Sequence, residues 1–354
     1  MSLILSGDTG VPVTTVTGTL PVANGGTGVA TAIDYGFKNR IINGSMVIDQ
    51  RNAGASVTPT NGSYGLDRWS FNATTASKFT AQQNAGAVTP PAGFANYLGV
   101  TSSSAYSVLS SDIFSIFQPI EGFNVADLAW GTASAATVTL SFRVYSSLTG
   151  TFGGALRNSA ANRAYPFTYS IPTANTWTTI SVTIAGDTSG TWLTTNGVGI
   201  TLSFGLGGGS TYSGTAGAWS GAGNYITATG ATSVVGTNGA TFYITGVQLE
   251  KGSTATSFDY RPYGTELALC QRYYEVIEYI YLMFPWGSGT QVIRSWVNYK
   301  VTKRAAATFT FGTKIEGAGT LGVTSGGPSG ITITGGGSFQ DVVGYSSATA
   351  SAEL

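Results

Sequence analysis

Histidine is absent from the 354 residues of the sequence, and cysteine occurs once, as Cys270. Without histidine the chain can build neither a Ser-His-Asp or Cys-His nucleophile system nor an HExxH zinc site. A single cysteine excludes an intrachain disulfide. The sequence also lacks a GKS or GKT element, so it has no Walker phosphate-binding loop. Carboxylates are therefore the main catalytic groups left, and the 16 acidic residues are spread thinly.

Charge is scarce as well. Only 9% of residues are charged and the formal net charge is zero, so the overall charge attracts neither nucleic acid nor anionic lipid. No run approaches the ~20 apolar residues that a membrane-spanning helix needs. Residues 1–10 hold only a Leu-Ile-Leu triplet, which is too short for the core of a signal peptide. The sequence thus predicts a soluble protein made in a cytoplasm, with no nucleic-acid partner and no insertion into a membrane.

Glycine, with 50 residues, is abundant, and from residue 34 to residue 262 apolar residues recur with a period of two. This alternation predicts antiparallel strands with one buried face. The spacing and length of the segments favour a jelly roll, a β-sandwich of two facing sheets. Three sets of residues are predicted to face the core: Val138, Leu140, Phe142 and Val144; Trp177, Ile180, Val182 and Ile184; and Val198, Ile200, Leu202 and Phe204.

Four regions are predicted along this mostly β chain. Residues 1–33 form either a frayed terminus or, as their apolar residues favour, an extended arm that orders against partner chains. Residues 34–262 form the sandwich, and residues 263–284 a helical connector and a strand. Residues 285–354 form a small C-terminal β domain, which is marginal alone and is expected to be completed by oligomerisation.

The connector begins where the last strand of the sandwich ends. The apolar positions change parity across Gly246, which predicts a glycine β-bulge. Residues 264–277 then predict about three helical turns, followed by a strand. One apolar stripe at 3-4-3 spacing is either a threefold contact between chains or packing on its own domain, and it consists of Leu267, Cys270, Tyr274 and Ile277.

Aromatic residues are frequent in the segment from residue 188 to residue 249, which contains no charged residue. Tyr212, Trp219 and Tyr225 lie where glycine dominates and alternation fails, which predicts exposed loops. Trp192 in the same segment is a fourth candidate. Aromatic rings stack on the apolar faces of neutral sugars, while Ser, Thr and Asn bond the hydroxyls. The four residues are candidates for glycan binding, with subunit contact and plain loop packing as alternatives.

The few charged groups offer weaker candidates. Asp67, Arg68 and Trp69 form either a binding trio or, preferably, part of a strand with a buried ion pair. Glu250 stands where some sugar-binding jelly rolls hold Ca²⁺. No run in this sequence resembles a calcium loop, so neither a metal nor another cofactor is predicted.

The sequence marks no pair of acids as catalytic, and no enzyme is predicted. Glycoside hydrolysis needs two carboxyl groups roughly 5–9.5 Å apart across a cleft. The basic cluster of Lys300, Lys303 and Arg304 is interpreted as a solvated strand end, with contact to an anionic polysaccharide as the weaker alternative. The acids that cluster are Glu275 with Glu278, and Asp112 with Glu121 and Asp127.

Several segments, in their order and spacing, resemble bacteriophage tail-fibre and receptor-binding proteins. GTLPVANGGTG (18–28) is similar to a glycine-rich element near fibre N-termini. NRIINGSMVIDQR (39–51) and LDRW (66–69) resemble the opening of the fibre β-sandwich. GVQLEKGSTATSFDYRP and YGTELALCQRYY (246–274) resemble its closing strand and helical connector, and ATASAEL (348–354) fits fibre C-terminal modules. The QLEKG…AT…F portion is also similar to carbohydrate-binding modules of jelly-roll type.

This resemblance implies a non-enzymatic, homotrimeric fibre protein located in the virion after synthesis in the bacterial host. The N-terminal arm would dock on other virion proteins, and the β domains would face host surface polysaccharide or lipopolysaccharide. Alternatives are a purely structural tail, neck or head fibre with no receptor role, a polysaccharide depolymerase, and a free bacterial sugar-binding module.

Overall fold

The computed structural model describes residues 38–354 except 222, 284–290, 318 and 338–341. The predicted arm at 1–33 lies outside the described residues. In the described part of the chain, no helix is long and apolar enough to cross a membrane.

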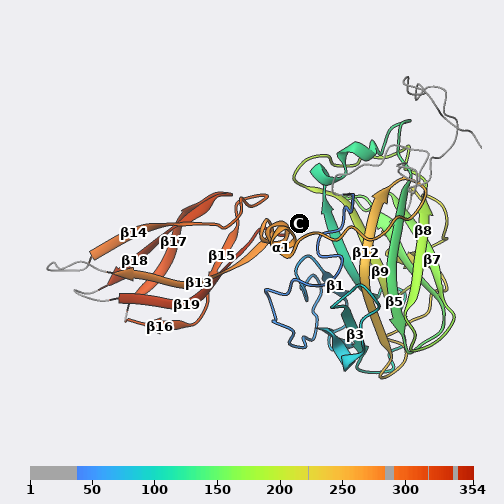
Figure 1. The fold of residues 1–354 in the computed structure, drawn as a ribbon, viewed down its shortest axis with the longest axis horizontal. Coiled ribbons are helices and arrows are strands. Elements are labelled where there is room, and N and C mark those ends of the chain that lie inside the picture. Colours follow the sequence, from blue (N-terminus) through green and yellow to red (C-terminus); the bar gives the residue numbers. More distant parts are fainter. Residues whose placement is uncertain (1–37, 222, 284–290, 318, 338–341) are drawn as a thin grey trace, which may run out of the picture. The chain divides into compact units, whose positions relative to one another are not determined.

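The predicted mostly β architecture is confirmed (Figure 1). Two five-stranded sheets face one another, and all their hydrogen-bonded neighbours are antiparallel. The first sheet has the order β1 (Ser70–Ala73), β4 (Ile113–Glu121), β9 (Val198–Gly208), β6 (Gly150–Arg157) and β7 (Ala164–Ile171). The second has the order β2 (Phe79–Gln83), β3 (Leu98–Ser102), β12 (Thr241–Lys251), β5 (Val138–Ser146) and β8 (Thr178–Ile184). Single-turn 3₁₀ helices lie at Ala85–Ala87, Gly122–Asn124 and Ala126–Leu128.

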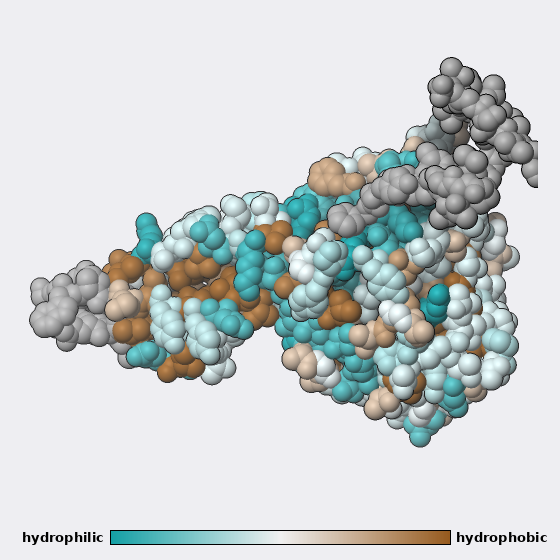
Figure 2. All heavy atoms as spheres, in the orientation of Figure 1, coloured by the Kyte–Doolittle hydropathy of each residue, from teal (hydrophilic) through white to brown (hydrophobic). Residues whose placement is uncertain are grey.

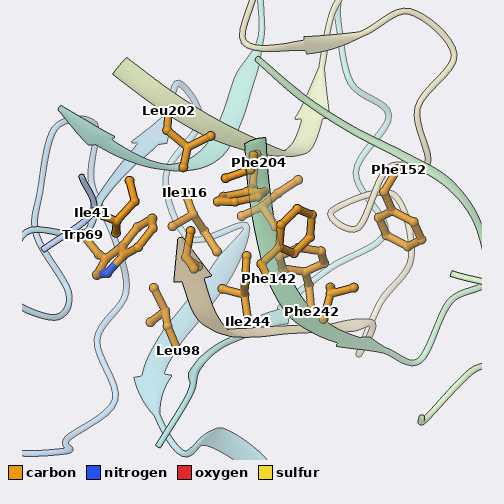
Figure 3. Packing of buried hydrophobic residues seen from close by; sticks show 14 of the residues in the cluster. Ile41, Trp69, Leu98, Ile116, Phe142, Phe152, Leu202, Phe204, Phe242 and Ile244 are labelled. Carbon is orange, nitrogen blue, oxygen red and sulfur yellow. The ribbon is translucent and has the colours of Figure 1, made fainter. Parts of the chain in front are cut away.

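Large aromatic residues join the two sheets in one core (Figure 3). The ring of Phe142 on β5 lies 5.0 Å from the ring of Tyr169 on β7 and 5.0 Å from that of Phe204 on β9. Phe242 on β12 lies 6.0 Å from Phe152 on β6. Because alternate residues of a strand point to one face, the predicted set on β5 is fully buried.

One predicted core residue faces the other way. Phe142 pairs with Ile180 and Val144 with Thr178, so the even-numbered apolar residues of β8 face the core. Trp177 precedes β8 at an odd position, and its ring contacts Tyr97 and Tyr145 on the outer side of the sheet. The prediction that Trp177 points inward with Ile180 was wrong, because a period of two places odd and even residues on opposite faces.

The predicted bulge at Gly246 is confirmed. The register of β12 against β5 shifts between Thr245 and Gln248, and Gly246 has a φ of 61°. A Cβ on Gly246 would lie 2.5 Å from the ring of Phe94, so glycine is needed both for the backbone conformation and for this close approach.

Strands of the C-terminal region form two smaller sheets with their own apolar core. The first has the order β13 (Tyr274–Met283), β19 (Val342–Ser351) and β15 (Thr308–Phe311), and β16 (Lys314–Glu316) also pairs with β19. The second has the order β14 (Gln291–Asn298), β18 (Gly330–Gly337) and β17 (Thr320–Gly326).

The connecting helix α1 (Tyr263–Gln271) has nine residues and is shorter than predicted. Its N-cap residue is Pro262, whose carbonyl accepts the backbone N–H of Glu266 at 3.1 Å. The predicted helix over 264–277 was wrong at its end, because Tyr274 and Ile277 lie on β13 and pair with Ser351 and Ala348. Pairing with β19 places these β-branched and aromatic residues in a sheet, where they pack well.

Ion pairs gather around α1, although the chain has few charges. Glu121 binds the guanidinium of Arg272 through both carboxylate oxygens, at 2.6 and 2.9 Å, and accepts a hydrogen bond from the Tyr273 hydroxyl. Lys303 and Glu275 form a pair at 3.0 Å in which both side chains are fully buried. The sandwich and the C-terminal strands are therefore connected by buried polar contacts as well as by the chain itself.

The carboxylate of Glu353 belongs to the same group of contacts. It pairs with Arg68, whose side chain is 1% exposed, and with Arg51. The guanidinium of Arg68 also lies 3.6 Å from the centre of the Tyr273 ring. A residue of the C-terminal strand end thus neutralises a buried cation of the sandwich.

Candidate functional site

The structure brings Trp192 and Trp219 together with Trp130, which the sequence did not single out. The three rings pack edge to face, with centres 4.8–5.4 Å apart. Every indole N–H donates to a backbone carbonyl: Trp130 to Ala136, Trp192 to Ser189 and Trp219 to Ala185. The adjoining cavity of about 10 Å³ has room for roughly one water molecule. These indoles hold three loops together, and their N–H groups are already used within the chain.

The two tyrosines of the glycine-rich segment, Tyr212 and Tyr225, are half exposed. The Tyr225 ring lies over Gly214 and Gly223, where an added Cβ would come within 2.4 Å of it. The segment folds back on β9, because the Ser203 hydroxyl donates to the Ile226 carbonyl at 2.9 Å. Tyr212, Trp219 and Tyr225 lie in loops, as predicted, but their side chains are only partly exposed, since glycine there permits close packing of the loop on the sheet.

The apolar stripe of the connector divides between two clusters. Cys270 is fully buried against Ile42, Ile48 and Tyr273 of its own chain, and Leu267 packs on the same cluster. Burial raises the pKa of the Cys270 thiol. Tyr274 lies under the Arg51 guanidinium, 3.7 Å from its ring centre, and Ile277 packs on the C-terminal core. Each of the four residues thus has contacts within its own chain. Cys270 has no exposed surface, whereas Leu267, Tyr274 and Ile277 stay partly exposed.

Contrary to the prediction, residues 67–69 do not form part of a strand. They lie in the turn before β1, and Arg68 pairs with Glu353 instead of Asp67. Asp67 accepts hydrogen bonds from the Gln50 backbone N–H at 2.7 Å and side-chain amide at 2.8 Å. Burial raises the pKa of Asp67 to about 6. Trp69 is fully buried and its N–H donates to the Asn43 carbonyl, so the trio is part of the core.

Apart from Glu278, which is exposed, the acids and bases that cluster in sequence are engaged in structural contacts. Glu121 and Glu275 are paired as described above, and Asp112 accepts from the Leu109 N–H and the Tyr106 hydroxyl. Glu250 accepts from the Thr256 backbone and hydroxyl and from the Gln248 amide. In the basic cluster Lys303 is buried, and Arg304 donates to the Ala352 and Asn196 carbonyls. Lys300 donates to the Val276 carbonyl, so this cluster stabilises the connector.

A row of aromatic side chains crosses the outer face of the second sheet. Tyr243 on β12 pairs with Tyr145 on β5, and the two rings stack at 5.3 Å with an interplanar angle of 6°. Trp177 follows on the β8 side, 5.5 Å from Tyr145, and Tyr97 stacks on Tyr243 at 5.1 Å. Tyr97 and Tyr243 are buried, which raises the pKa of each hydroxyl, whereas Tyr145 and Trp177 are half exposed. The row thus presents two rings to solvent on a rigid aromatic base.

Hydrogen bonds and glycines keep this aromatic row in place. The Trp177 N–H donates to the Thr89 carbonyl at 2.9 Å, and the Tyr97 hydroxyl to the Ala85 carbonyl at 2.6 Å. Gly99, opposite Tyr243, leaves room for that ring, because a Cβ there would lie 2.9 Å from it. The rings are therefore fixed before any ligand arrives, which lowers the entropy cost of binding.

Polar residues continue the same face beyond the aromatic row. The next outward positions are Thr245, Arg143 and Thr179 on β12, β5 and β8, and after them Gln248, Ser141 and Ser181. Thr245, Gln248 and Ser141 are buried, so the accessible polar groups of this face are Arg143, Thr179 and Ser181. Successive rows on one face of a sheet are ~7 Å apart. Hydroxyls and a guanidinium beside flat rings are the groups that bind saccharides, since rings stack on pyranose faces and polar groups bond the hydroxyls.

The sequence contained part of the signal for this surface. Tyr145 and Tyr243 lie at outward positions of strands in which apolar residues alternate with others. Trp177, at an odd position, lies opposite to the even-numbered apolar residues of β8. What the sequence did not provide is the register that sets the three side by side, because β5 and β12 are separated by more than ninety residues.

Comparisons with known proteins gave similar folds only. No protein-family model and no curated protein matches the chain. Among solved structures, the enzymatically active domain of bacteriophage CBA120 tailspike protein 4 is 14% identical, with a TM-score of 0.33, over 60% of this chain and 21% of that one. A putative sugar binding protein from Bacteroides thetaiotaomicron is 14% identical, with a TM-score of 0.34, over 61% and 100%.

A family 11 carbohydrate-binding module from Clostridium thermocellum, in complex with a mixed-linked tetrasaccharide, is 12% identical. It has a TM-score of 0.29 over 56% of this chain and 97% of that one. The chain thus spans about a fifth of the tailspike structure that it matches. Similarities at these identities and TM-scores do not establish a function. A function for this chain is therefore inferred from its own residues.

Proposed function

We propose that the chain is a non-enzymatic fibre protein of a phage virion and binds host surface glycan through the outer face of its second sheet. The observation that carries this proposal is the aromatic row, with Tyr145 and Trp177 half exposed on a rigid base beside a polar strip. The sequence segments that resemble phage fibres support the virion role, with the arm at 1–33 attached to other virion proteins.

We also propose that the fibre is a homotrimer held in part by its C-terminal strands. Among the described residues, β13 and β14 are edge strands with a neighbour on one side only. Apolar side chains gather on the surface of this region (Figure 2). Edge strands and exposed apolar side chains are features that soluble monomers normally avoid. The exposed large apolar residues of the two edge strands are Tyr279, Tyr281, Met283, Val292 and Trp296.

The proposed glycan surface predicts different effects for two tryptophans. Each is half-buried and donates its N–H to one backbone carbonyl, Trp177 to Thr89 and Trp219 to Ala185. Trp177→Ala is expected to reduce adsorption of the fibre to host cells about two- to tenfold, since loss of a stacking ring costs roughly 0.5–1.5 kcal/mol. Trp219→Ala is the matched control, and it is expected to leave adsorption unchanged.

Adsorption and circular dichroism of both variants check this expectation. Equal adsorption by the wild type and the folded Trp177→Ala variant would contradict the glycan surface and favour a purely structural fibre. Release of reducing ends from host polysaccharide by the wild type would instead support a depolymerase.

The proposed trimer predicts a mass in solution of three times the 36.3 kDa of one chain, measured by light scattering. Met283→Ser combined with Trp296→Ser is expected to weaken the trimer, because both side chains are exposed in the single chain. Leu109→Ser, at an exposed apolar position of the sandwich, is expected to leave the mass unchanged. A monomeric wild type at micromolar concentration would overturn the proposal.

A further inference from the structure

Arg143 is a cation without a partner on the proposed glycan surface. In the described part of the chain its side chain makes neither an ion pair nor a hydrogen bond, and it is half exposed. The other arginines of the sandwich strands and loops are engaged. Arg40 pairs with Asp127, Arg163 with Asp187, and Arg157 donates to the Asn224 side chain. Of the described arginines, Arg294 on β14 also lacks an ion pair or a side-chain hydrogen bond, but it is exposed, whereas Arg143 is half exposed on the sheet face that carries the aromatic row.

The position of Arg143 links it to the aromatic row. It precedes Tyr145 by two residues on β5, so both side chains project from the same face, ~7 Å apart along the strand. Its cross-strand neighbours are Thr179 on β8, which is exposed, and Thr245 on β12, whose hydroxyl donates to the Asn96 carbonyl. The open side of Arg143 is therefore the β8 side, where Trp177 and Thr179 lie.

No acid competes for this guanidinium on the neighbouring rows. The outward positions of β5 and β8 carry only hydroxyl, aromatic and guanidinium groups. The outward acid of β12 is Glu250, two rows farther along, and its carboxylate is occupied by Thr256 and Gln248. An anion placed beside Arg143 would therefore meet a cation and hydroxyl donors and no nearby negative charge.

We infer that this strip selects an anionic saccharide. Trp177 stacks on the apolar face of one pyranose beside Tyr145, and Arg143 binds the carboxylate or phosphate carried by the next sugar through paired N–H donors. Thr179 and Ser181 are placed to bond sugar hydroxyls. The inference rests on the proposed glycan surface and adds its substrate class, a polysaccharide with uronic acid or sugar phosphate units.

The test compares charged and neutral forms of the same ligand on the full chain by calorimetry. Oligogalacturonate and its carboxyl-reduced form probe a carboxylate, and a phosphorylated mannan oligosaccharide and its dephosphorylated form probe a phosphate. The wild type is expected to bind one charged form roughly ten- to hundredfold more tightly than its neutral form, as a charge-assisted hydrogen bond allows. Arg143→Gln is expected to abolish this difference, and Arg143→Lys to keep part of it.

The outcomes separate this inference from the proposed function. If the wild type binds charged and neutral forms equally or binds none of them, or if its preference survives in Arg143→Gln, the inference is overturned. Binding of the neutral forms that is lost in Trp177→Ala but unchanged in Arg143→Gln would overturn the inference and leave the glycan surface standing. Binding that Trp177→Ala does not change would overturn the glycan surface itself.

Discussion

Glu353→Gln is expected to lower the free energy of unfolding by about 3–5 kcal/mol. The carboxylate of Glu353 is the anionic partner of Arg68, whose side chain is 1% exposed. Glutamine keeps the size of the side chain but removes its charge, so the Arg68 guanidinium would remain buried with no counter-charge. A buried charge without a partner is costly because the interior solvates it poorly.

Urea unfolding of the wild type and three variants measures this effect. Asp127→Asn is the matched control, because it removes an exposed partner of Arg40 and is expected to change stability by less than about 1 kcal/mol. The double variant Arg68→Met with Glu353→Leu is expected to recover part of the loss, since it leaves no buried charge between them. Equal stability of Glu353→Gln and Asp127→Asn would show that Arg68 is solvated in the folded protein.

Phe142→Ala is expected to lower the free energy of unfolding by about 3–5 kcal/mol, the range for deleting a buried aromatic side chain. Phe142 is fully buried on β5, and its ring lies 5.0 Å from the rings of Tyr169 and Phe204 on the facing sheet (Figure 3). Alanine would remove contacts to both rings and leave a cavity between the sheets.

The matched control is Phe123→Ala, which makes the same chemical change at a side chain that is 60% exposed. It is expected to alter stability by no more than about 0.5 kcal/mol. Thermal and urea unfolding compare the two variants. A loss at Phe142 no greater than that at Phe123 would mean that the two sheets do not share one core.

Much of the fold could be predicted from local patterns. Alternation identified β5, β8 and β9 and their buried faces, since the side chains of a strand point to two sides whatever its partners are. The bulge at Gly246 could be predicted for the same reason, because the apolar residues change parity there. The end of α1 was predicted less well, since the residues after Gln271 suit a helix or a strand and pairing with β19 decided between them.

The candidate site could be predicted only in part. The sequence predicted glycan binding by aromatic residues of a segment without charged groups, and the candidates were Trp192, Trp219, Tyr212 and Tyr225. Trp192 and Trp219 pack on each other and on Trp130, and Tyr225 packs on two glycines of its own loop. The aromatic row of Tyr145, Tyr243 and Trp177 depends on the register of three strands that are distant in sequence.

The sequence by itself determined a mostly β, low-charge chain without histidine chemistry, because composition and alternation are local properties of the residues. Only the tertiary structure decided which side chains meet. Arg68 and Glu353 are 285 positions apart, and no local pattern marks them as partners. Arg143 is marked out only by the absence of a partner in the described chain, and that becomes visible once the neighbouring strands are in register. Contacts between distant segments depend on how the sheets pair and pack, and these contacts define both the buried ion pairs and the proposed glycan surface.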